Sequence, residues 1–327
     1  MSSAACRKPA ISINRNVGNV TDRCRDVWNC EISAPDEKRQ ILEWLSPLAP
    51  RARHQAIGEG RINRLGDWLL RTNEFEKWHT GEDQAVHPVL FCYGDPGVGK
   101  TYLRCVKVTL EMACKTKPIN TSSLVIDTLS DSTNGGNVAV ACMYCDFLVH
   151  KEQSAAGVLA ALLKQLVAEI EPMPQEITEA FERAKREVDG WTLRLPEICA
   201  MLVKSLSSPR RVFICIDALD EFPTKHRPEL WNSLRGILRE CPNTRLFISG
   251  RPHIREEVKK YFPECHYLMP IKPPKEDIQG YILMRLERDS EPDAMDMELG
   301  FEILRIISDK ISGVYVTSVG SESKVIG

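Results

Sequence analysis

The stretch that most constrains the fold of this chain is "GDPGVGKT" at residues 94–101, which directly follows the apolar run "VLFCY" at residues 89–93. It fills every fixed position of the pattern GxxxxGK[ST]. Glycines let successive backbone N–H groups curl around phosphate oxygens, and the helix that follows points its positive end at the same anion. The sequence therefore predicts a buried strand, a phosphate-binding loop and a helix, in that order.

The predicted nucleotide-binding residues are those of the loop: Gly94, Asp95, Pro96, Gly97, Val98, Gly99, Lys100 and Thr101. We expect Lys100 to reach the β- and γ-phosphates and the Thr101 hydroxyl to ligate Mg²⁺. The expected cofactor is Mg²⁺ with ATP or GTP, because we find no short pattern that specifies the base. A glycine turn with a surface lysine is the alternative interpretation.

A second motif is "RRVFICIDALDEF" at residues 210–222, in which an apolar run ends in Asp217. A carboxylate at the end of a buried strand is costly unless a cation or hydrogen-bond donors await it. Mg²⁺, held directly by Thr101 and through water by Asp217, would supply that cation. Asp220 and Glu221 follow one turn later, where either can orient an attacking water, with Asp220 preferred. An acidic helix start after a strand is the alternative.

A third motif, "TRLFISGRP" at residues 244–252, brings Ser249 and Arg251 to the end of another apolar strand. Ligands bind at the carboxyl ends of parallel strands, so we expect Arg251 to sense or stabilise the γ-phosphate. An ordinary surface arginine before a proline is the alternative. The candidate catalytic residues are Asp220, Glu221 and Arg251.

Short apolar runs alternate with helical patterns along most of the chain. The expected strands are residues 89–93, 138–147, 212–217, 245–249 and 266–271, and the expected helices between them are 153–171, 174–188, 196–207, 227–240 and 252–261. Continuous apolar runs indicate strands covered on both faces. This order predicts an α/β P-loop NTPase fold with a parallel sheet of about five strands and helices on both faces. Helical patterns at 36–48 and 61–79 form a lead-in, and 274–311 a partial helical lid.

The order of the motifs also separates classes of P-loop protein. The strand at 138–147 comes between the loop strand and the Asp217 strand, as in the ATPases with an additional strand. Small GTPases carry Asp-x-x-Gly after the second strand and Asn-Lys-x-Asp later, whereas this chain has "DALD" and lacks the second tetrapeptide. The additional-strand class is therefore favoured over a small GTPase, and we find no basic lid of the kind that a small-molecule kinase usually carries.

Composition and charge exclude several function classes. The 327 residues are 43% hydrophobic and 27% charged, with a formal net charge of −2. We therefore expect a cytoplasmic protein, with no nucleic-acid and no membrane partner. Twelve cysteines are scattered, and the pair Cys142 and Cys145 has no second CxxC downstream, so buried reduced thiols are favoured over a zinc site.

Several stretches together resemble one known family. They are the lead-in "ILEWLSPLAPRARHQAI" and "GDWLLRTNEFEKW", the loop "CYGDPGVGKT", the boxes "DALDEF" and "FISGRP", and "EDIQGYILMRL". Over about residues 36–316 the chain is similar to the NACHT NTPases of the STAND class, in particular the fungal type with a nephrocystin-3-like N-terminal NACHT domain. The resemblance implies an ATP- or GTP-dependent switch that hydrolyses its nucleotide slowly and whose nucleotide state controls self-assembly. For fungal members it implies non-self recognition and heterokaryon incompatibility.

The chain departs from that family at both ends. We find no effector domain in residues 1–35, and no winged-helix module or sensor repeats after residue 316. A truncated member is therefore expected, and the alternative function is a non-hydrolysing scaffold or decoy that associates with full-length NACHT proteins. The expected divisions are a flexible arm (1–35), the lead-in (36–80), the NTPase core (81–271), the partial lid (272–316) and an aberrant tail (317–327).

The helix that belongs to the loop is ambiguous in the sequence. In the family a helix similar to "SSLVIDTL" follows the loop at once, but here this stretch stands at residues 122–129, about twenty residues after Thr101. One hypothesis is that residues 105–122, and the terminal tail with them, are translated retained intron. The alternative is that residues 102–114 form the helix, since four apolar side chains share one face, and "SLVIDTL" packs at an edge. Sequencing the transcript across codons 101–125 distinguishes the two.

Overall fold

The computed structural model describes residues 34–59, 65–81, 88–94, 121–131, 138–146, 153–187, 192–265, 267–277, 279–280, 283 and 305. The chain divides into two units, Met1–Gln40 and Ile41–Gly327. The first contributes only the beginning of helix α1 (Ala34–Leu45) to the described residues. The fold and the site below belong to the second unit.

Five parallel strands form one sheet in the order β2-β3-β4-β1-β5. They are β1 (Val89–Tyr93), β2 (Val138–Tyr144), β3 (Arg211–Asp217), β4 (Thr244–Gly250) and β5 (Tyr267–Pro270). In the register Tyr144 pairs with Asp217, and Tyr93 pairs with Gly250. The carboxyl ends of the strands therefore lie at one edge, and the prediction of a five-stranded parallel sheet is confirmed.

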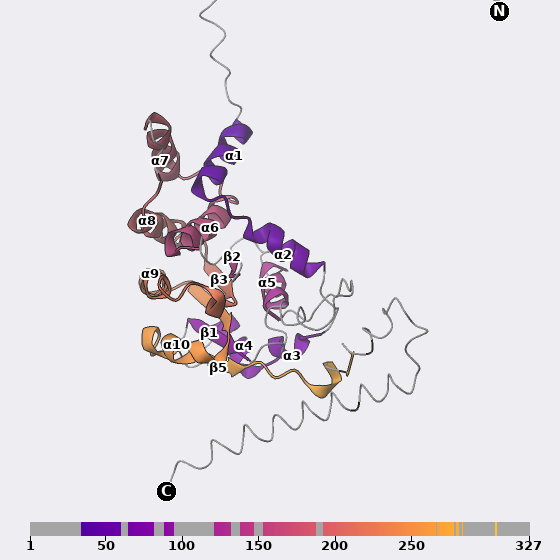
Figure 1. Cartoon of the computed structure of the whole chain (residues 1–327). Coiled ribbons are helices and arrows are strands. Elements are labelled where there is room, and N and C mark those ends of the chain that lie inside the picture. Colours follow the sequence, from indigo (N-terminus) through magenta and orange to yellow (C-terminus); the bar gives the residue numbers. More distant parts are fainter. Residues whose placement is uncertain are drawn as a thin grey trace, which may run out of the picture. The chain divides into compact units, whose positions relative to one another are not determined.

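Helices cover both faces of the sheet, as Figure 1 shows. One face packs against α6 (Ala155–Val167), α7 (Gln175–Arg186), α8 (Leu195–Leu206), α9 (Arg227–Glu240) and α10 (Arg255–Tyr261). The other packs against α2 (Pro50–Gly58), α3 (Asp67–Leu70), α4 (Asn73–Thr80) and α5 (Thr121–Asp131). Strand side chains alternate between two cores, so Ile214 and Ile216 lie in one and Phe213 and Cys215 in the other.

Several expected boundaries were wrong, for local reasons. Strand β2 ends at Tyr144, short of the expected residue 147. The single helical pattern at 61–79 is two helices, because Thr72 has extended backbone and its hydroxyl accepts the N–H of Phe75 to begin α4. The lead-in also contains α2, which begins at Pro50, where a missing N–H costs a helix nothing. Of the expected lid at 272–316, only residues 272–277, 279–280, 283 and 305 are described.

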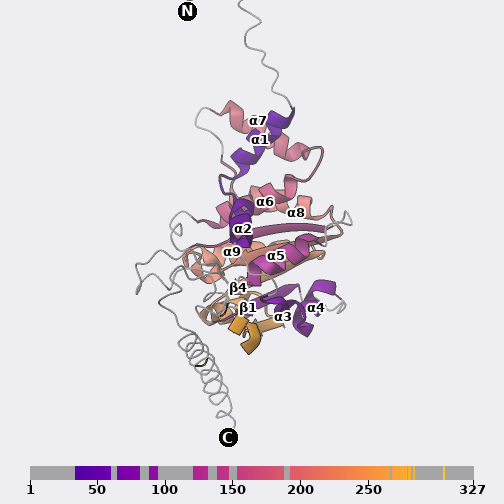
Figure 2. The same ribbon diagram turned by 90° about the vertical axis from the view of Figure 1, so that its right-hand side faces the viewer.

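Helix α5 answers part of the question of the loop's helix. Its residues Val125, Ile126 and Leu129 are buried in the core of the α2–α5 face, and Figure 2 shows it in front of the strands, between α2 and α3. The stretch "SSLVIDTL" is thus a helix on the sheet. Since α5 begins at Thr121, the proposed insert 105–122 overlaps its first two residues. The alternative helix at 102–114 lies outside the described residues.

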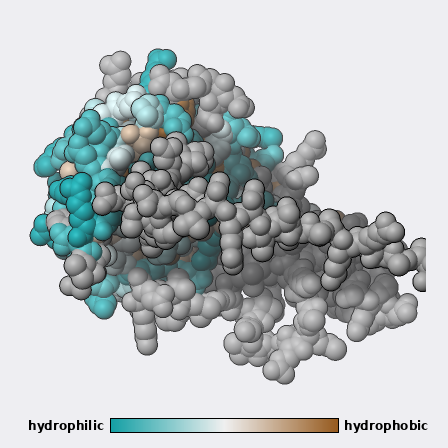
Figure 3. All heavy atoms as spheres, turned by 90° about the horizontal axis from the view of Figure 1, so that it is seen from above, coloured by the Kyte–Doolittle hydropathy of each residue, from teal (hydrophilic) through white to brown (hydrophobic). Residues whose placement is uncertain are grey.

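The surface and the cysteines fit the composition. Cys92, Cys142 and Cys215 of the strands, and Cys145 just after β2, are buried and free, as expected for reduced thiols. The described atoms visible in Figure 3 are mostly hydrophilic, and Leu283 is an exposed large hydrophobic residue. No described helix combines the length and the hydropathy that crossing a bilayer requires.

Candidate functional site

The predicted site residues that are described gather at the carboxyl edge of the sheet. Gly94, the first residue of the loop, is buried, and its backbone N–H donates to the carbonyl oxygen of Gly250 at 3.3 Å. The first residue of the loop therefore lies directly beside the end of β4. Its partner there, Gly250, immediately precedes Arg251 in the sequence. The other loop residues, from Asp95 to Thr101, lie outside the described part of the chain.

Asp217 ends β3 and is completely buried. Its Oδ1 accepts hydrogen bonds from two hydroxyls, Ser122 Oγ of α5 at 2.6 Å and Ser249 Oγ of β4. Ser249 Oγ in turn accepts the backbone N–H of Ala218 at 3.0 Å. A buried carboxylate needs such donors, because leaving it without them would cost several kcal/mol. The predicted meeting of the "FICID" and "FISGRP" strand ends is thus a direct contact.

Asp220 and Arg251 form an ion pair across the two strand ends. Arg251 Nε lies 3.0 Å from Asp220 Oδ2, and the backbone N–H of Arg251 donates to Oδ1 at 3.0 Å. The Asp220 side chain is 5% exposed and that of Arg251 44%. Arg251 is therefore not a surface arginine without a partner, and its guanidinium is held at the edge where the loop begins.

The turn after β3 is held in an unusual conformation. Ala218 has φ 52° and ψ 44°, the left-handed region that non-glycine residues rarely adopt. The buried guanidinium of Arg227 donates to the carbonyl oxygens of Phe222 at 2.9 Å and Asp220 at 3.2 Å. Those two bonds come from Nη2, and Arg227 Nη1 donates to Glu257 Oε1 at 2.8 Å. These contacts fix the turn that carries the two candidate catalytic carboxylates.

Negative charge concentrates at this edge. Burial, followed by the charges of Asp217, Glu221 and Asp220, raises the pKa of the Cys145 thiol. Nucleotide sites hold Mg²⁺ by one or two side-chain oxygens together with phosphate oxygens. The Asp217 carboxylate and the hydroxyls of Ser122 and Ser249 are oxygens of the kind this ion prefers. The residues present therefore fit Mg²⁺.

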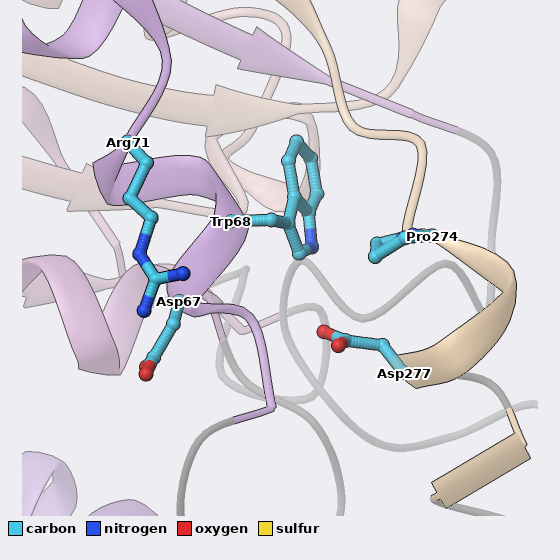
Figure 4. A pocket seen from close by; sticks show the side chains of 5 residues that line it. All are labelled: Asp67, Trp68, Arg71, Pro274 and Asp277. Carbon is cyan, nitrogen blue, oxygen red and sulfur yellow. The ribbon is translucent and has the colours of Figure 1, made fainter.

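A cavity of about 620 Å³ lies near the end of β5 (Figure 4). Asp67, Trp68 and Arg71 line one side and Pro274 and Asp277 the other, with the Trp68 indole ring facing the proline across the gap. Asp277 Oδ2 accepts the backbone N–H of Gly66, which has φ 95°. Trp68 Nε1 is buried without a hydrogen-bond partner among the described residues.

Three parts of this site were not predicted from the sequence. Ser122 carried a weak signal, two serines before an apolar helix, but that helix had two competing assignments. Arg227 carried no signal, because its acceptors are mostly backbone carbonyls that only the folded turn presents. The cavity joins residues about two hundred positions apart, which no local pattern reveals.

The fold and the site define a class of protein. A parallel sheet with β4 between β1 and β3, a glycine loop after β1 and an acidic end on β3 form the P-loop NTPase fold with an additional strand. The chain belongs to the family described as "Nephrocystin 3, N-terminal", which matches residues 64–251, more than half of the chain. The resemblance expected from the sequence is thereby confirmed.

A curated relative is vegetative incompatibility protein HET-E-1 of Podospora anserina, 27% identical over 223 residues. The match covers 67% of this chain and 15% of that protein, so the chain spans only a small part of the relative's length.

Two solved structures are similar with low scores. The Walker-type ATPase PABY2304 of Pyrococcus abyssi is 12% identical, with a TM-score of 0.38 and coverage of 77% of this chain and 76% of that one. The ORC1 protein of Aeropyrum pernix in complex with DNA is 18% identical, with a TM-score of 0.40 and coverage of 77% and 56%. The fold assignment rests on the strand order of this chain rather than on these scores.

Proposed function

We propose that this chain is a NACHT-type switch that binds ATP or GTP with Mg²⁺ at the carboxyl edge of its sheet and hydrolyses the nucleotide slowly. One observation carries the proposal. The first loop residue, Gly94, is hydrogen-bonded to Gly250 at the edge that also holds Asp217, Ser249 and Arg251. The first residue of the phosphate loop thus lies at the same edge of the sheet as the acidic and basic groups.

Each described residue of the site has a separate role in this proposal. Asp217, held by two hydroxyls, would carry the negative charge that faces the ion. Mg²⁺, when bound, would neutralise phosphate charge there together with Lys100 and Thr101 of the loop. Arg251 is the cation for the γ-phosphate. Because both oxygens of Asp220 contact Arg251, Asp220 positions the arginine, and Glu221 becomes the better candidate to orient the attacking water.

The cavity of Figure 4 is the candidate binding site for the nucleotide base. Its volume of about 620 Å³ lies in the usual range for small-molecule sites. Strand β5 is the parallel neighbour of β1, so the carboxyl ends of these two strands lie side by side. The indole of Trp68 offers a face on which a base can stack. Asp277 offers carboxylate oxygens to the amino groups of adenine or guanine.

We also infer a biological role from the similarity to the curated relative. The relative is a vegetative incompatibility protein, which supports a role in incompatibility signalling. The cytoplasm is the compartment that we propose for this role. Self-association, or association with full-length NACHT proteins, would connect the nucleotide state to that signal. The proposed divisions are the lead-in 36–80, the NTPase core 81–271 and the lid 272–316.

The test is equilibrium binding of fluorescent ATP and GTP to this chain with Mg²⁺. Lys100→Ala removes the charge that faces the β- and γ-phosphates, so we expect it to abolish saturable binding. Lys77→Ala changes an exposed lysine on α4 and serves as the matched control. Affinity equal in wild type and Lys100→Ala would contradict the proposal. If a folded wild type binds neither nucleotide but co-purifies with an intact homologue, the scaffold or decoy function replaces it.

A further inference from the structure

The carboxylate of Asp217 is contacted by a serine that lies far from the phosphate loop in the sequence. Ser122 stands in the first turn of α5, is completely buried, and places its Oγ 2.6 Å from Asp217 Oδ1. Ser249 Oγ of β4 donates to the same oxygen from the neighbouring strand. Two donors on one oxygen fix the rotation of the carboxylate.

Helix α5 cannot easily shift away from this contact. Its apolar side chains lie in the core against β2 and β3. On another side of the helix, His54 Nε2 of α2 lies 2.9 Å from Asp127 Oδ1. The other ring nitrogen of His54 lies 2.7 Å from the Tyr144 hydroxyl of β2. The contact of Asp127 with His54 and the buried apolar side chains thus fix the position of α5, and with it the position of Ser122.

We propose that Ser122 is the positioning residue on which the Mg²⁺ affinity of this site depends. The inference rests on the proposed function, and it goes beyond the sequence prediction, which gave the metal-site hydroxyl to Thr101. In the described residues the Asp217 carboxylate accepts one hydroxyl from α5 and one from β4, and Ser122 supplies the one from α5. Buried hydroxyl and carboxylate oxygens, hydrogen-bonded to each other, form the hard oxygen environment that Mg²⁺ selects.

The test measures the Mg²⁺ concentration that half-saturates the binding of a fluorescent nucleotide. We expect Ser122→Ala to raise this concentration by about tenfold or more, because a hydrogen bond to a charged group is lost. Binding measured in EDTA should not change. Ser122→Thr keeps the hydroxyl and should restore the value to within about twofold of wild type.

Ser123→Ala is the matched control, because Ser123 is the next residue of α5 and is also completely buried. It should leave the Mg²⁺ midpoint unchanged. If Ser122→Ala does not fold, Ser122→Cys keeps the side-chain volume, replaces the hydroxyl by a weak donor, and should show the same shift.

The outcomes separate this inference from the proposed function. If wild type binds nucleotide with Mg²⁺ and Ser122→Ala has the same midpoint, the inference is wrong and the function stands. A shift in Thr101→Ala without one in Ser122→Ala would likewise overturn it. If wild type binds no nucleotide, the proposed function fails first and the inference fails with it.

Discussion

Arg251 is joined to Asp220 through both its side chain and its backbone, with Nε 3.0 Å from Oδ2 and the N–H donating to Oδ1 at 3.0 Å. This double contact ties the end of β4 to the turn after β3. It places a half-exposed guanidinium beside Gly250, the residue whose carbonyl accepts the N–H of Gly94. The geometry thus links the start of the loop to the candidate sensor arginine.

The first prediction concerns this arginine. Arg251→Ala should lower the rate of nucleotide hydrolysis by roughly 10²–10³-fold, since the charge expected at the transferred phosphate is lost. Nucleotide affinity should change far less, because Lys100 and the loop remain. Single-turnover hydrolysis and equilibrium binding separate the two effects. Arg239→Ala on α9, an exposed arginine, is the control, and an equal loss in both variants would refute the role of Arg251.

A second prediction concerns the close packing at Gly250. A Cβ at this position would lie 2.6 Å from Ile254 Cδ1 and 3.4 Å from Asp220 Oδ1. Ile254 is completely buried, so it cannot move aside freely. Gly250→Ala should therefore lower the free energy of unfolding by about 1–3 kcal/mol. Urea denaturation followed by circular dichroism measures this change.

Two further variants test whether the contact with Ile254 causes the loss of stability in Gly250→Ala. Ile254→Val removes the Cδ1 atom, so the double variant should lose less stability than the sum of the two single losses. Gly236→Ala in helix α9 meets nothing within 4 Å and should raise stability by about 0.4–1 kcal/mol. Additive losses in the double variant would mean that the steric contact at Ile254 is not the cause.

A third prediction concerns the pH dependence of stability. His79 lies between the rings of Phe75 and Phe213, with centroid distances of 5.8 and 5.7 Å. Burial, followed by the positive charge of Arg211, lowers the pKa of His79 below its usual 6.5. The unfolded chain therefore binds the proton first as the pH falls. Above pH 6.5 His79 is neutral in both states, so the free energy of unfolding has its full value there. Below pH 6.5 the free energy of unfolding falls, and it continues to fall until the pH reaches the pKa of His79 in the folded protein.

Replacing this histidine removes the effect. His79→Phe should show a smaller loss of unfolding free energy between pH 7 and pH 5 than wild type does, measured by urea denaturation at each pH. The remaining histidines are shared by both proteins and cancel in the comparison. An equal or steeper loss in the variant would show that His79 is not destabilised in its charged form.

Much of this architecture was predictable because its signals are local. Continuous apolar runs predicted every strand of the sheet, since strands covered on both faces need apolar side chains at successive positions. Parallel topology then predicted that Asp217 and Arg251 would lie at one edge. The break between α3 and α4 was missed because both sides carry helical periodicity and only the backbone of Thr72 interrupts it.

The rest of the site depends on tertiary contacts that the sequence does not display. Ser122 reaches Asp217 only because α5 begins at Thr121, and the helical pattern at 102–114 was a competing assignment for the helix of the loop. The roles of Arg227 and His54 depend on partners from other elements, which no spacing along the chain indicates.

The measurement that tests the central claim most directly is the effect of Mg²⁺ on nucleotide affinity in wild type and Asp217→Asn. Asparagine keeps the size and the hydrogen-bonding oxygen but removes the charge. We predict that Mg²⁺ tightens binding to wild type by about tenfold or more and has little effect on Asp217→Asn, while both bind alike in EDTA. An equal response to Mg²⁺ in both proteins would contradict a magnesium nucleotide site at the end of β3.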